Sequence, residues 1–280
     1  MTLWRADGPA SNVWRFLDTG AALGAWNMAV DEAMAIEAAQ GVATPTLRVF
    51  AWQPPCISLG YHQRVEEIDR ERCLADGVEL VRRPTGGRAI LHHEELTYSV
   101  VIPASSPWFG EEVAQTYELI SLALVEGLKS LGVAARFERA QQTEVDYRRG
   151  EFSVPCFSSS VRNEVLWKGR KLVGSAQRRY EGAVLQHGSI LLGSAHLRLV
   201  DYLAGLDEQK RARYREHLRQ RTAAVNEIAG REVSFAEMAE ALAKGFARGV
   251  GVSVRSGELT EKETARATEL LAKYQDPTRR

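Results

Sequence analysis

Apolar residues recur along the chain with two different periods, and this predicts helices that alternate with strands. A first helix is predicted to begin near Gly24–Asn27, because four apolar side chains fall on one face there: Trp26, Val30, Ala33 and Met34. A longer apolar stripe predicts a second helix over about 113–131, which Gly132 ends. Each helix therefore has one face that must pack against another element.

Short apolar runs of strand length surround these helices. They favour strands because β-branched and aromatic residues fit a pleated surface, and the predicted strands are Thr46–Trp52, Cys56–Leu59, Glu79–Arg82, Leu96–Ile102, Val133–Phe137, Asn163–Trp167, Lys171–Ser175 and Ala183–Leu192. A Lys168-Gly169 turn predicts that two of them form a hairpin. The order of the strands in a sheet does not follow from this pattern.

The last third of the sequence changes character, because charged helical segments run to its end. Ser234 with Glu237 and Thr260 with Glu263 have the spacing of capping boxes, and each pair predicts a helix start. The whole pattern predicts an α/β (α+β) fold in which a mixed sheet is flanked by helices and followed by a helical C-terminal part.

Composition narrows the classes of function. The 280 residues carry 36 Lys and Arg against 36 Asp and Glu, and this zero net charge favours neither nucleic acid nor an anionic membrane as partner. The N-terminal residues lack an apolar export segment, and the apolar runs are too short to span a membrane. The three cysteines, Cys56, Cys73 and Cys156, form no CxxC and no metal-ligand cluster, which predicts free thiols in a reducing cytoplasm and no metal site.

A glycine-rich segment, Arg82–His92, is the first candidate site. Gly86 and Gly87 lie between arginines, so the backbone can approach a ligand closely, and its N–H groups can hold a phosphate or a carbonyl oxygen. The alternative is a hairpin turn with solvated arginines, which composition alone favours because short glycine motifs match often by chance.

Cys156, in Pro155-Cys156-Phe157, is the candidate nucleophile. Attack of a thiolate on an acyl thioester gives a second thioester, so the acyl group is stored in a form that an amine can attack. The thiolate requires a nearby cation or donor that lowers the pKa of the thiol. The alternative is a small buried apolar residue, which is the role of most free cysteines.

A third segment, Lys168–Gln177, places a lysine beside small residues. Lys171 can donate to an acyl carbonyl and stabilise the oxyanion of a tetrahedral intermediate, while Gly174, Ser175 and Ala176 leave room for a substrate. The alternative is a solvated lysine at the end of a hairpin.

Two histidine positions are open to two interpretations. His92 and His93 are adjacent, so in a strand they point to opposite faces, and one of them can assist proton transfer. His187 lies in an apolar strand, where the alternative to a functional role is a hydrogen-bonded core histidine.

Taken together, Arg82–His92, Lys171–Ala176 and Gln186–Ser189 resemble the lipoate–protein ligase A and octanoyltransferase family, which is related in fold to the biotin protein ligases. The resemblance implies a biotin/lipoate protein ligase-like catalytic domain over residues 25–250 and a C-terminal helical extension over residues 251–280. His-Asp often follows the glycine motif in this family. The His92-His93 pair departs from it and leaves the role of the second position open.

Within the family, the segment around Cys156, upstream of Lys171, most resembles the octanoyltransferases of the LipM type, in which a cysteine at this place carries the octanoyl group. The resemblance implies octanoyl-acyl carrier protein as donor, a lysine of a lipoyl domain such as the glycine cleavage H protein as acceptor, and no cofactor. In the mechanism that follows, Cys156 expels the donor thiol, Lys171 polarises the acyl carbonyl, and His92 is a candidate base for the acceptor amine.

The glycine loop and the small residues after Lys171 are expected to shape an acyl tunnel or to hold its polar end. The residues predicted to bind substrate are Arg83, Thr85, Gly86, Gly87, Arg88, Ala89, His92, Gly174, Ser175 and Ala176. An acyl chain gains roughly 0.8 kcal/mol per buried CH₂, so an apolar slot can bind the tail and measure its length.

Three rival functions remain open. An ATP-dependent lipoate–protein ligase would form an adenylate with the same loop and lysine and would require ATP and Mg²⁺; Arg162-Asn163-Glu164 resembles the Arg-Asn-Asp stretch of such ligases. An amidotransferase would move the acyl group between lipoyl domains through a cysteine. A non-catalytic module that holds a lipoyl domain would form a complex without a covalent adduct.

Overall fold

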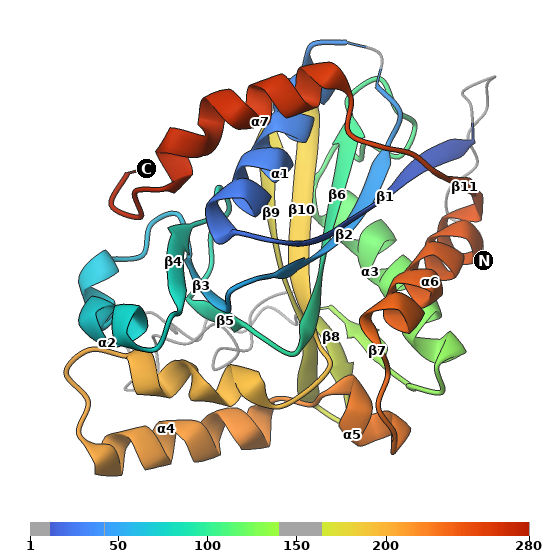
Figure 1. Cartoon of the computed structure of the whole chain (residues 1–280). Helices are drawn as coiled ribbons and strands as arrows, with labels where there is room; N and C mark the ends of the chain where they lie inside the picture. Colours follow the sequence, from blue (N-terminus) through green and yellow to red (C-terminus); the bar gives the residue numbers. More distant parts are fainter. Residues whose placement is uncertain (1–11, 42, 140–163, 280) are drawn as a thin grey trace.

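A computed structural model describes residues 12–41, 43–139 and 164–279, and its strands form one large and one small sheet (Figure 1). The strand order in the large sheet is β11-β1-β2-β6-β10-β9-β8-β7. These strands are β1 (Val13–Ala22), β2 (Thr46–Trp52), β6 (Glu95–Pro103), β7 (Arg136–Glu138), β8 (Glu164–Trp167), β9 (Arg170–Tyr180), β10 (Ala183–Leu191) and β11 (Ser253–Ser256). β11, β1 and β2 run parallel, and all other neighbours are antiparallel.

The small sheet has the order β4-β3-β5 and lies beside the large one (Figure 1). Its strands are β3 (Cys56–Leu59), β4 (Glu79–Arg82) and β5 (Ile90–His92). Its apolar residues share a core with η4 (Ala195–Tyr202) and α4 (Glu208–Arg221), so these two helices support the small sheet.

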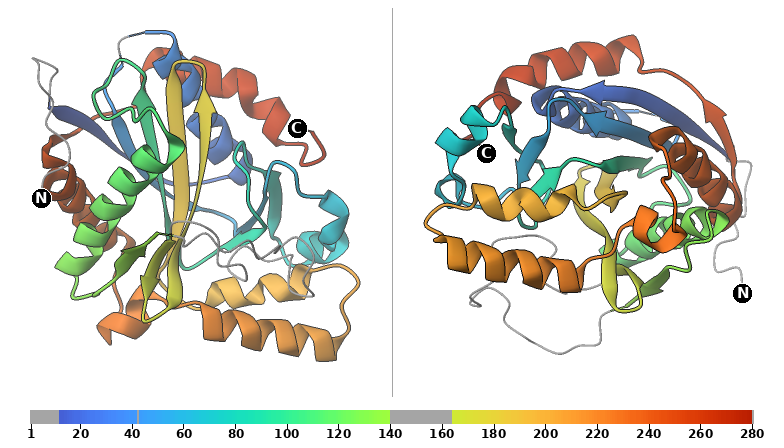
Figure 2. Two further views of the ribbon diagram at one scale, coloured as in Figure 1. Left: turned by 180° about the vertical axis from the view of Figure 1, so that it is seen from behind. Right: turned by 60° about the horizontal axis from the view of Figure 1, so that its bottom comes forward.

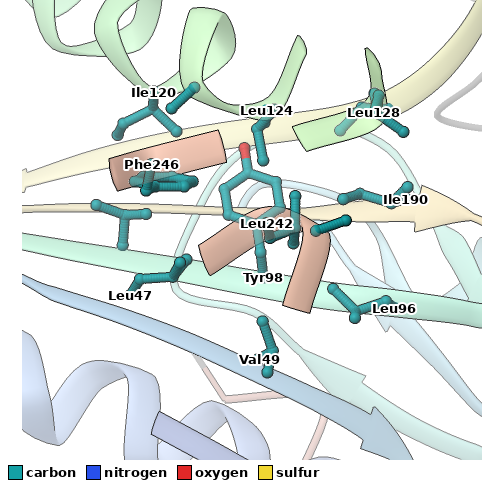
Figure 3. Packing of buried hydrophobic residues seen from close by; sticks show 14 of the residues in the cluster. Leu47, Val49, Leu96, Tyr98, Ile120, Leu124, Leu128, Ile190, Leu242 and Phe246 are labelled. Atoms are coloured by element: carbon teal, nitrogen blue, oxygen red, sulfur yellow. The ribbon is translucent and has the colours of Figure 1, made fainter. Parts of the chain in front are cut away.

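Helices cover both faces of the large sheet. α1 (Gly24–Ala39) and α7 (Glu261–Tyr274) pack together on one face, and α3 (Val113–Ser130) and α6 (Phe235–Phe246) pack on the other (Figure 2). Tyr98, Leu124 and Leu242 meet in the core under α3 and α6 (Figure 3). The shorter helices are η1 (Val65–Glu67), α2 (Arg70–Ala75), α5 (Val225–Ala229) and η5 (Ala247–Gly251).

The predicted mixed α/β fold is confirmed. β2, β3 and β4 have the predicted bounds, and α1 and α3 lie where the two apolar stripes placed them. Val113 is the exception in the α3 stripe, because it lies in the first turn and is 54% exposed. The Lys168-Gly169 turn joins β8 to β9 with φ values of 48° and 76°, which is the left-handed backbone that a two-residue hairpin requires.

Other elements differ from the prediction. β1, β5 and α2 were not predicted. The strand predicted over Val133–Phe137 is wrong in its bounds, since β7 begins only at Arg136. The N–H of Val133 donates to the carbonyl of Leu128 at 3.1 Å, so this residue closes the end of α3 instead of entering the sheet.

The C-terminal part is not wholly helical, because β11 joins the edge of the large sheet beside β1. One of the two predicted capping boxes is complete: Thr260 and Glu263 each accept from the other's backbone N–H at the start of α7. At α6, Ser234 accepts from the N–H of Glu237, but the carboxylate of Glu237 pairs with Arg231 at 2.5 Å instead. A nearby arginine therefore outcompetes the backbone N–H for this carboxylate.

The segment after residue 250 thus packs on the same body as the rest of the chain, with a strand in the large sheet and a helix across α1 (Figure 1). Within the described ranges, no helix is both long and apolar enough to cross a membrane.

Candidate functional site

A cavity of about 410 Å³ is lined by residues of both sheets and of α1. The lining combines apolar or small residues with a few polar ones: Met28, Trp52, Ser58, Arg83, Gly87, Ile90, His92, Thr97, Gly174, Ser175, Ala176, His187, Gly188 and Ser189. An apolar chain with one polar end fits such a surface.

Two neighbouring strands supply the small residues of the cavity. Gly188 of β10 lies opposite Ser175 of β9, and a Cβ at Gly188 would lie 2.5 Å from the carbonyl oxygen of Gly174. No larger residue fits at Gly188 without moving β9. Glycine is therefore required at this position of the strand pair, and Gly174, Ser175 and Ala176 line the cavity beside it.

The glycine-rich loop is held from inside by Arg83. Its guanidinium donates to the carbonyl oxygens of Gly86, Arg88 and Ser58 at 2.7–3.1 Å, and the residue is 4% exposed. Gly87 has a φ of 97°, and Gly60 packs so closely on it that a Cβ at Gly60 would overlap the carbonyl of Gly87. The loop is therefore a rigid part of the cavity wall.

Arg82 is also buried, and it points away from the cavity. It donates to the carbonyl oxygens of Gly60, Tyr61 and Gln63 at 2.7–3.1 Å and to that of Pro277 at 3.0 Å. The interpretation of this segment as a turn with solvated arginines is therefore wrong for Arg82 and Arg83, because both guanidinium groups are buried and donate to backbone carbonyl oxygens inside the protein.

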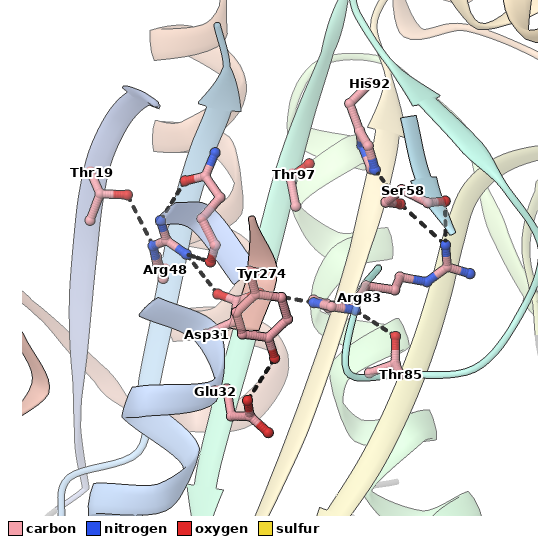
Figure 4. Close-up of polar contacts among 12 residues, drawn as sticks. Thr19, Asp31, Glu32, Arg48, Ser58, Arg83, Thr85, His92, Thr97 and Tyr274 are labelled. Carbon is pink, nitrogen blue, oxygen red and sulfur yellow. Dashed lines mark hydrogen bonds and ion pairs between the residues drawn. The ribbon is translucent and has the colours of Figure 1, made fainter. Parts of the chain in front are cut away.

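A buried polar chain connects the glycine loop to the centre of the molecule. Arg48 pairs with Asp31 at 2.7 Å (Figure 4), and the other carboxylate oxygen of Asp31 contacts Nδ1 of His187 at 2.8 Å. Nε2 of His187 lies 2.6 Å from the hydroxyl of Thr85. Because Nδ1–H donates to the carboxylate, Nε2 accepts from the hydroxyl of Thr85. These hydrogen bonds fix the tautomer of His187 and also hold the glycine loop in place.

A second polar chain lines the cavity itself. Nε2 of His92 lies 2.7 Å from Ser58 Oγ (Figure 4), and Nδ1 lies 3.1 Å from the carboxylate of Glu95. The ring of Trp52 stacks on His92 with a centroid distance of 4.0 Å and a tilt of 14°. Burial lowers the pKa of His92, and Arg83 adds to this effect, so the imidazole is neutral at neutral pH.

Lys171 is buried at the start of β9 and does not line the cavity. Its Nζ pairs with Glu164 on β8 at 2.7 Å, and both side chains are 10% exposed. The backbone carbonyl of Lys171 accepts from the N–H of Ala223, which ties β9 to the chain after α4. The interpretation of Lys171 as a solvated lysine is therefore wrong, while its catalytic role stays a prediction.

The two described cysteines are poor nucleophiles. Burial raises the pKa of the Cys56 thiol in β3 well above its ordinary value. Burial likewise raises the pKa of Cys73 in α2 to about 11. Both thiols stay protonated at neutral pH, so neither supplies a thiolate. Cys156 lies outside the described residues, as does its neighbour Phe157.

The structure separates the predicted binding residues into two groups. The cavity is lined by Arg83, Gly87, His92, Gly174, Ser175 and Ala176. The others lie outside its lining: Thr85, Gly86, Arg88 and Ala89. Ala89 is fully buried in the core under the small sheet.

Several cavity residues were not predicted from the sequence. Ser58, Thr97 and Trp52 come from three strands, and nothing in their local sequence marks them as neighbours. Outside the lining, Asp31 had a signal, because a carboxylate on the buried part of a helix requires a partner when α7 covers that helix.

The family model for the lipoyl protein ligase A/B catalytic domain matches residues 24–247, most of the chain. The chain belongs to this family. An octanoyltransferase LipM of Kyrpidia tusciae is 44% identical over 262 residues, which cover 93% of this chain and 96% of that relative. An octanoyltransferase LipM of Staphylococcus aureus is 37% identical over 266 residues, with 94% and 96% covered.

Solved structures place this lipoyl protein ligase A/B family member on the same fold. A structure from the lipoylation system of Thermoplasma acidophilum, which contains a bipartite lipoate protein ligase and its E2 lipoyl domain, matches with a TM-score of 0.76 and 28% identity, covering 93% of this chain and 92% of that one. A lipoate-protein ligase A bound with ATP matches with a TM-score of 0.73 and 25% identity, covering 95% and 96%. The predicted family and fold are both confirmed.

No group of three or more His, Cys, Asp or Glu side chains in the described part of this family member could hold a metal ion. The polar groups that line the cavity are hydroxyls, imidazoles and one guanidinium. These groups can donate and accept protons and hydrogen bonds at an acyl carbonyl, which is chemistry suited to acyl transfer.

Proposed function

We infer that this protein is an octanoyltransferase of protein lipoylation. The observation that carries this conclusion is the likeness over nearly the full length to relatives named octanoyltransferase LipM, at 37–44% identity. The cavity supports this conclusion, because its lining includes glycine, alanine and apolar side chains, which suit a saturated acyl chain. Each buried CH₂ of that chain contributes roughly 0.8 kcal/mol of binding free energy.

The donor in this proposal is octanoyl-acyl carrier protein, and the acceptor is a lysine of a lipoyl domain such as the glycine cleavage H protein. The reaction exchanges a thioester for an amide, which is downhill and requires neither ATP nor a metal. An ATP-dependent ligase would need both, and it is the rival that the experiment below must exclude.

Cys156 is the proposed carrier of the octanoyl group. Its thiolate attacks the carbonyl carbon of the donor thioester, and the C–S bond to the carrier breaks. The carrier thiolate then takes up the proton that the Cys156 thiol released when it ionised. The raised pKa values of Cys56 and Cys73 support this assignment, since both of those thiols are disfavoured as nucleophiles.

Lys171 is the proposed electrostatic partner of the acyl carbonyl. Its ion pair with Glu164 holds the ammonium group in one place at the start of β9, the strand that supplies Gly174, Ser175 and Ala176 to the cavity. A cation fixed near the carbonyl stabilises the oxyanion in the transition state more than the substrate, because the negative charge develops only there.

The experiment is to mix the protein with octanoyl-acyl carrier protein and to record the intact mass. Wild type is expected to gain one octanoyl group, and Cys156→Ala is expected to gain none and to lose transfer to a lipoyl domain. Cys73→Ala is the matched control, because it removes a thiol without touching the cavity, and it should acylate like wild type.

Two outcomes would contradict the proposal. Transfer by Cys156→Ala at the wild-type rate would remove the cysteine from the mechanism. Lipoylation that needs ATP and free lipoate, with no use of the acyl carrier protein, would establish the ligase alternative instead. Lys171→Ala is expected to slow acylation by about 10²-fold or more, in line with the loss of one oxyanion donor.

A further inference from the structure

The neutral form of His92 sets the direction of the hydrogen bonds through Ser58, His92 and Glu95. Nδ1 faces the carboxylate of Glu95, which only accepts, so Nε2 accepts the proton of Ser58 Oγ at 2.7 Å, and Arg83 donates to the same Oγ at 3.2 Å. His92 therefore carries its own proton on Nδ1 and donates it to Glu95 at 3.1 Å. Every donor in the chain points from the cavity towards the carboxylate.

The far end of this chain is fixed as well. Thr97 donates to the same carboxylate oxygen of Glu95 at 2.5 Å and accepts from the indole N–H of Trp52 at 2.7 Å. The second carboxylate oxygen of Glu95 is buried and has no hydrogen-bond partner among the described residues. A carboxylate in this setting favours a positive charge on the neighbouring imidazole.

The near end of the chain opens on the cavity. Ser58 and His92 both line it, although Ser58 as a whole is fully buried. A hydroxyl oxygen can accept two hydrogen bonds, and among the described residues only Arg83 donates to Ser58 Oγ. One acceptor position of Ser58 therefore remains for a substrate N–H.

We propose that Ser58, His92 and Glu95 form the proton relay that activates the acceptor lysine of the lipoyl domain. Ser58 contacts the ammonium group, His92 takes the proton through Ser58, and Glu95 is the positioning residue that holds the imidazole and balances its charge. This proposal rests on the proposed function, and it names the base that acyl transfer to an amine requires.

The proton inventory of the step is balanced. The ammonium gives one proton to Ser58 Oγ as Ser58 gives its own to Nε2 of His92. The neutral amine then attacks the octanoyl carbonyl of acyl-Cys156, so that the C–N bond forms and the C–S bond breaks. The second nitrogen proton goes to the departing sulfur, and the proton on His92 passes to solvent after the amide leaves.

Other charged groups near His92 tune this relay. Arg83 and His187 disfavour its protonated form, whereas Glu95 favours it. The neutral imidazole is thus the resting form, and Glu95 stabilises the imidazolium that forms during the step.

The test isolates the second half of the reaction. The octanoyl enzyme is first prepared from octanoyl-acyl carrier protein and verified by intact mass, and its reaction with a lipoyl domain is then followed between pH 6.5 and 9.5. For Ser58→Ala and His92→Gln we expect a loss of about 10²-fold or more at pH 7. The loss should shrink as the pH rises, because a free lysine with a pKa near ~10.4 then deprotonates without a base.

A second nucleophile separates a base from a structural role. Hydroxylamine is already neutral at pH 7, so both variants should react with it at nearly the wild-type rate. Ser99→Ala is the matched control, since Ser99 is a fully buried serine of β6 that does not line the cavity, and it should behave like wild type with both nucleophiles. For Glu95→Gln we expect a loss that is smaller than that of His92→Gln but has the same pH dependence.

Four outcomes would overturn the relay. Wild-type transfer rates in Ser58→Ala and His92→Gln, with acylation of Cys156 intact, would remove the relay and leave the proposed function standing. An equal deficit at every pH and with both nucleophiles would make the role structural. An octanoyl ester on Ser58 would make this residue a nucleophile instead. Failure of wild type to form any octanoyl enzyme would overturn the relay together with the proposed function.

Discussion

The two faces of the large sheet are packed by opposite means. Under α3 and α6 the core consists of aliphatic and aromatic side chains, and a Cβ at Gly245 of α6 would lie only 2.5 Å from the carbonyl oxygen of Ala123 on α3. Under α1 and α7 the core contains buried charge, because Asp31, Glu32 and Arg48 are all less than 5% exposed. The charged face adjoins the cavity, because Met28 of α1 and His187, the partner of Asp31, both line it.

This difference shows where the protein accepts an energetic cost for function. Burial of apolar surface stabilises a fold without specifying any chemistry. A buried ion pair contributes little net stability, because desolvation offsets most of the attraction. The burial of Asp31 and Arg48 is better explained by function. Asp31 orients His187, and His187 in turn orients the loop at Thr85.

Asp31→Ala is expected to give the largest effect on the charged face. It leaves the guanidinium of Arg48 buried without its carboxylate, and this should lower the free energy of unfolding by about 3–5 kcal/mol. Urea denaturation measures the loss. Activity per folded molecule should also fall, because His187 loses its orientation.

Leu124→Ala is the counterpart on the apolar face. The cavity that it leaves should cost about 2–5 kcal/mol, comparable with the first variant, while the transfer rate of the folded enzyme stays at the wild-type level. If both variants lost activity equally, or neither did, the functional contrast between the two faces would be wrong.

A pH dependence of stability is the next largest effect expected. His196 in η4 is buried and bonded to Thr222 at 2.8 Å, and burial lowers its pKa to about 4. The unfolded chain binds this proton below about pH 6.5 and the folded chain does not, so stability present at pH 7.5 is lost as the pH falls. Between pH 7.5 and pH 5 the loss should be about 2 kcal/mol, because the two states differ by one proton over roughly 1.5 pH units.

His196→Gln should flatten this part of the curve. Denaturant midpoints at pH 7.5 and pH 5 measure the difference for both proteins. A wild-type slope in the His196→Gln variant would show that the imidazole does not stay neutral in the fold.

Thr85→Val is expected to give the smallest effect on stability and the most selective one on function. It removes the hydroxyl that donates to His187, at a cost of about 1–2 kcal/mol. The glycine loop then loses one restraint, so the KM for the octanoyl donor should rise more than kcat falls. Thr116→Val is the matched control, because it removes one hydrogen bond of a buried threonine on the α3 face. A similar rise in KM for both variants would show that the loop does not depend on His187.

Much of the fold followed from local sequence. The helix over Gly24–Ala39, the strand Thr46–Trp52 and the Lys168-Gly169 hairpin were predicted because periodicity and turn chemistry depend on residues only a few positions apart. β1 and β11 were missed for the opposite reason. β11 is the edge strand and β1 lies next to it, and their pairing joins residues some 240 positions apart, such as Val13 and Ser253.

The sequence by itself determined the family, the candidate chemical groups and the segments that contain them, since the glycine loop and the small residues around Ser175 each consist of consecutive residues. Only the tertiary structure decided which groups meet. His187 and Asp31 are 156 positions apart, and Ser58 and His92 are 34 apart, so their contacts exist only once the sheets have formed. It also turned Arg82 and Arg83 from surface charges into internal donors, because the folded backbone around them left carbonyl oxygens that no water reaches.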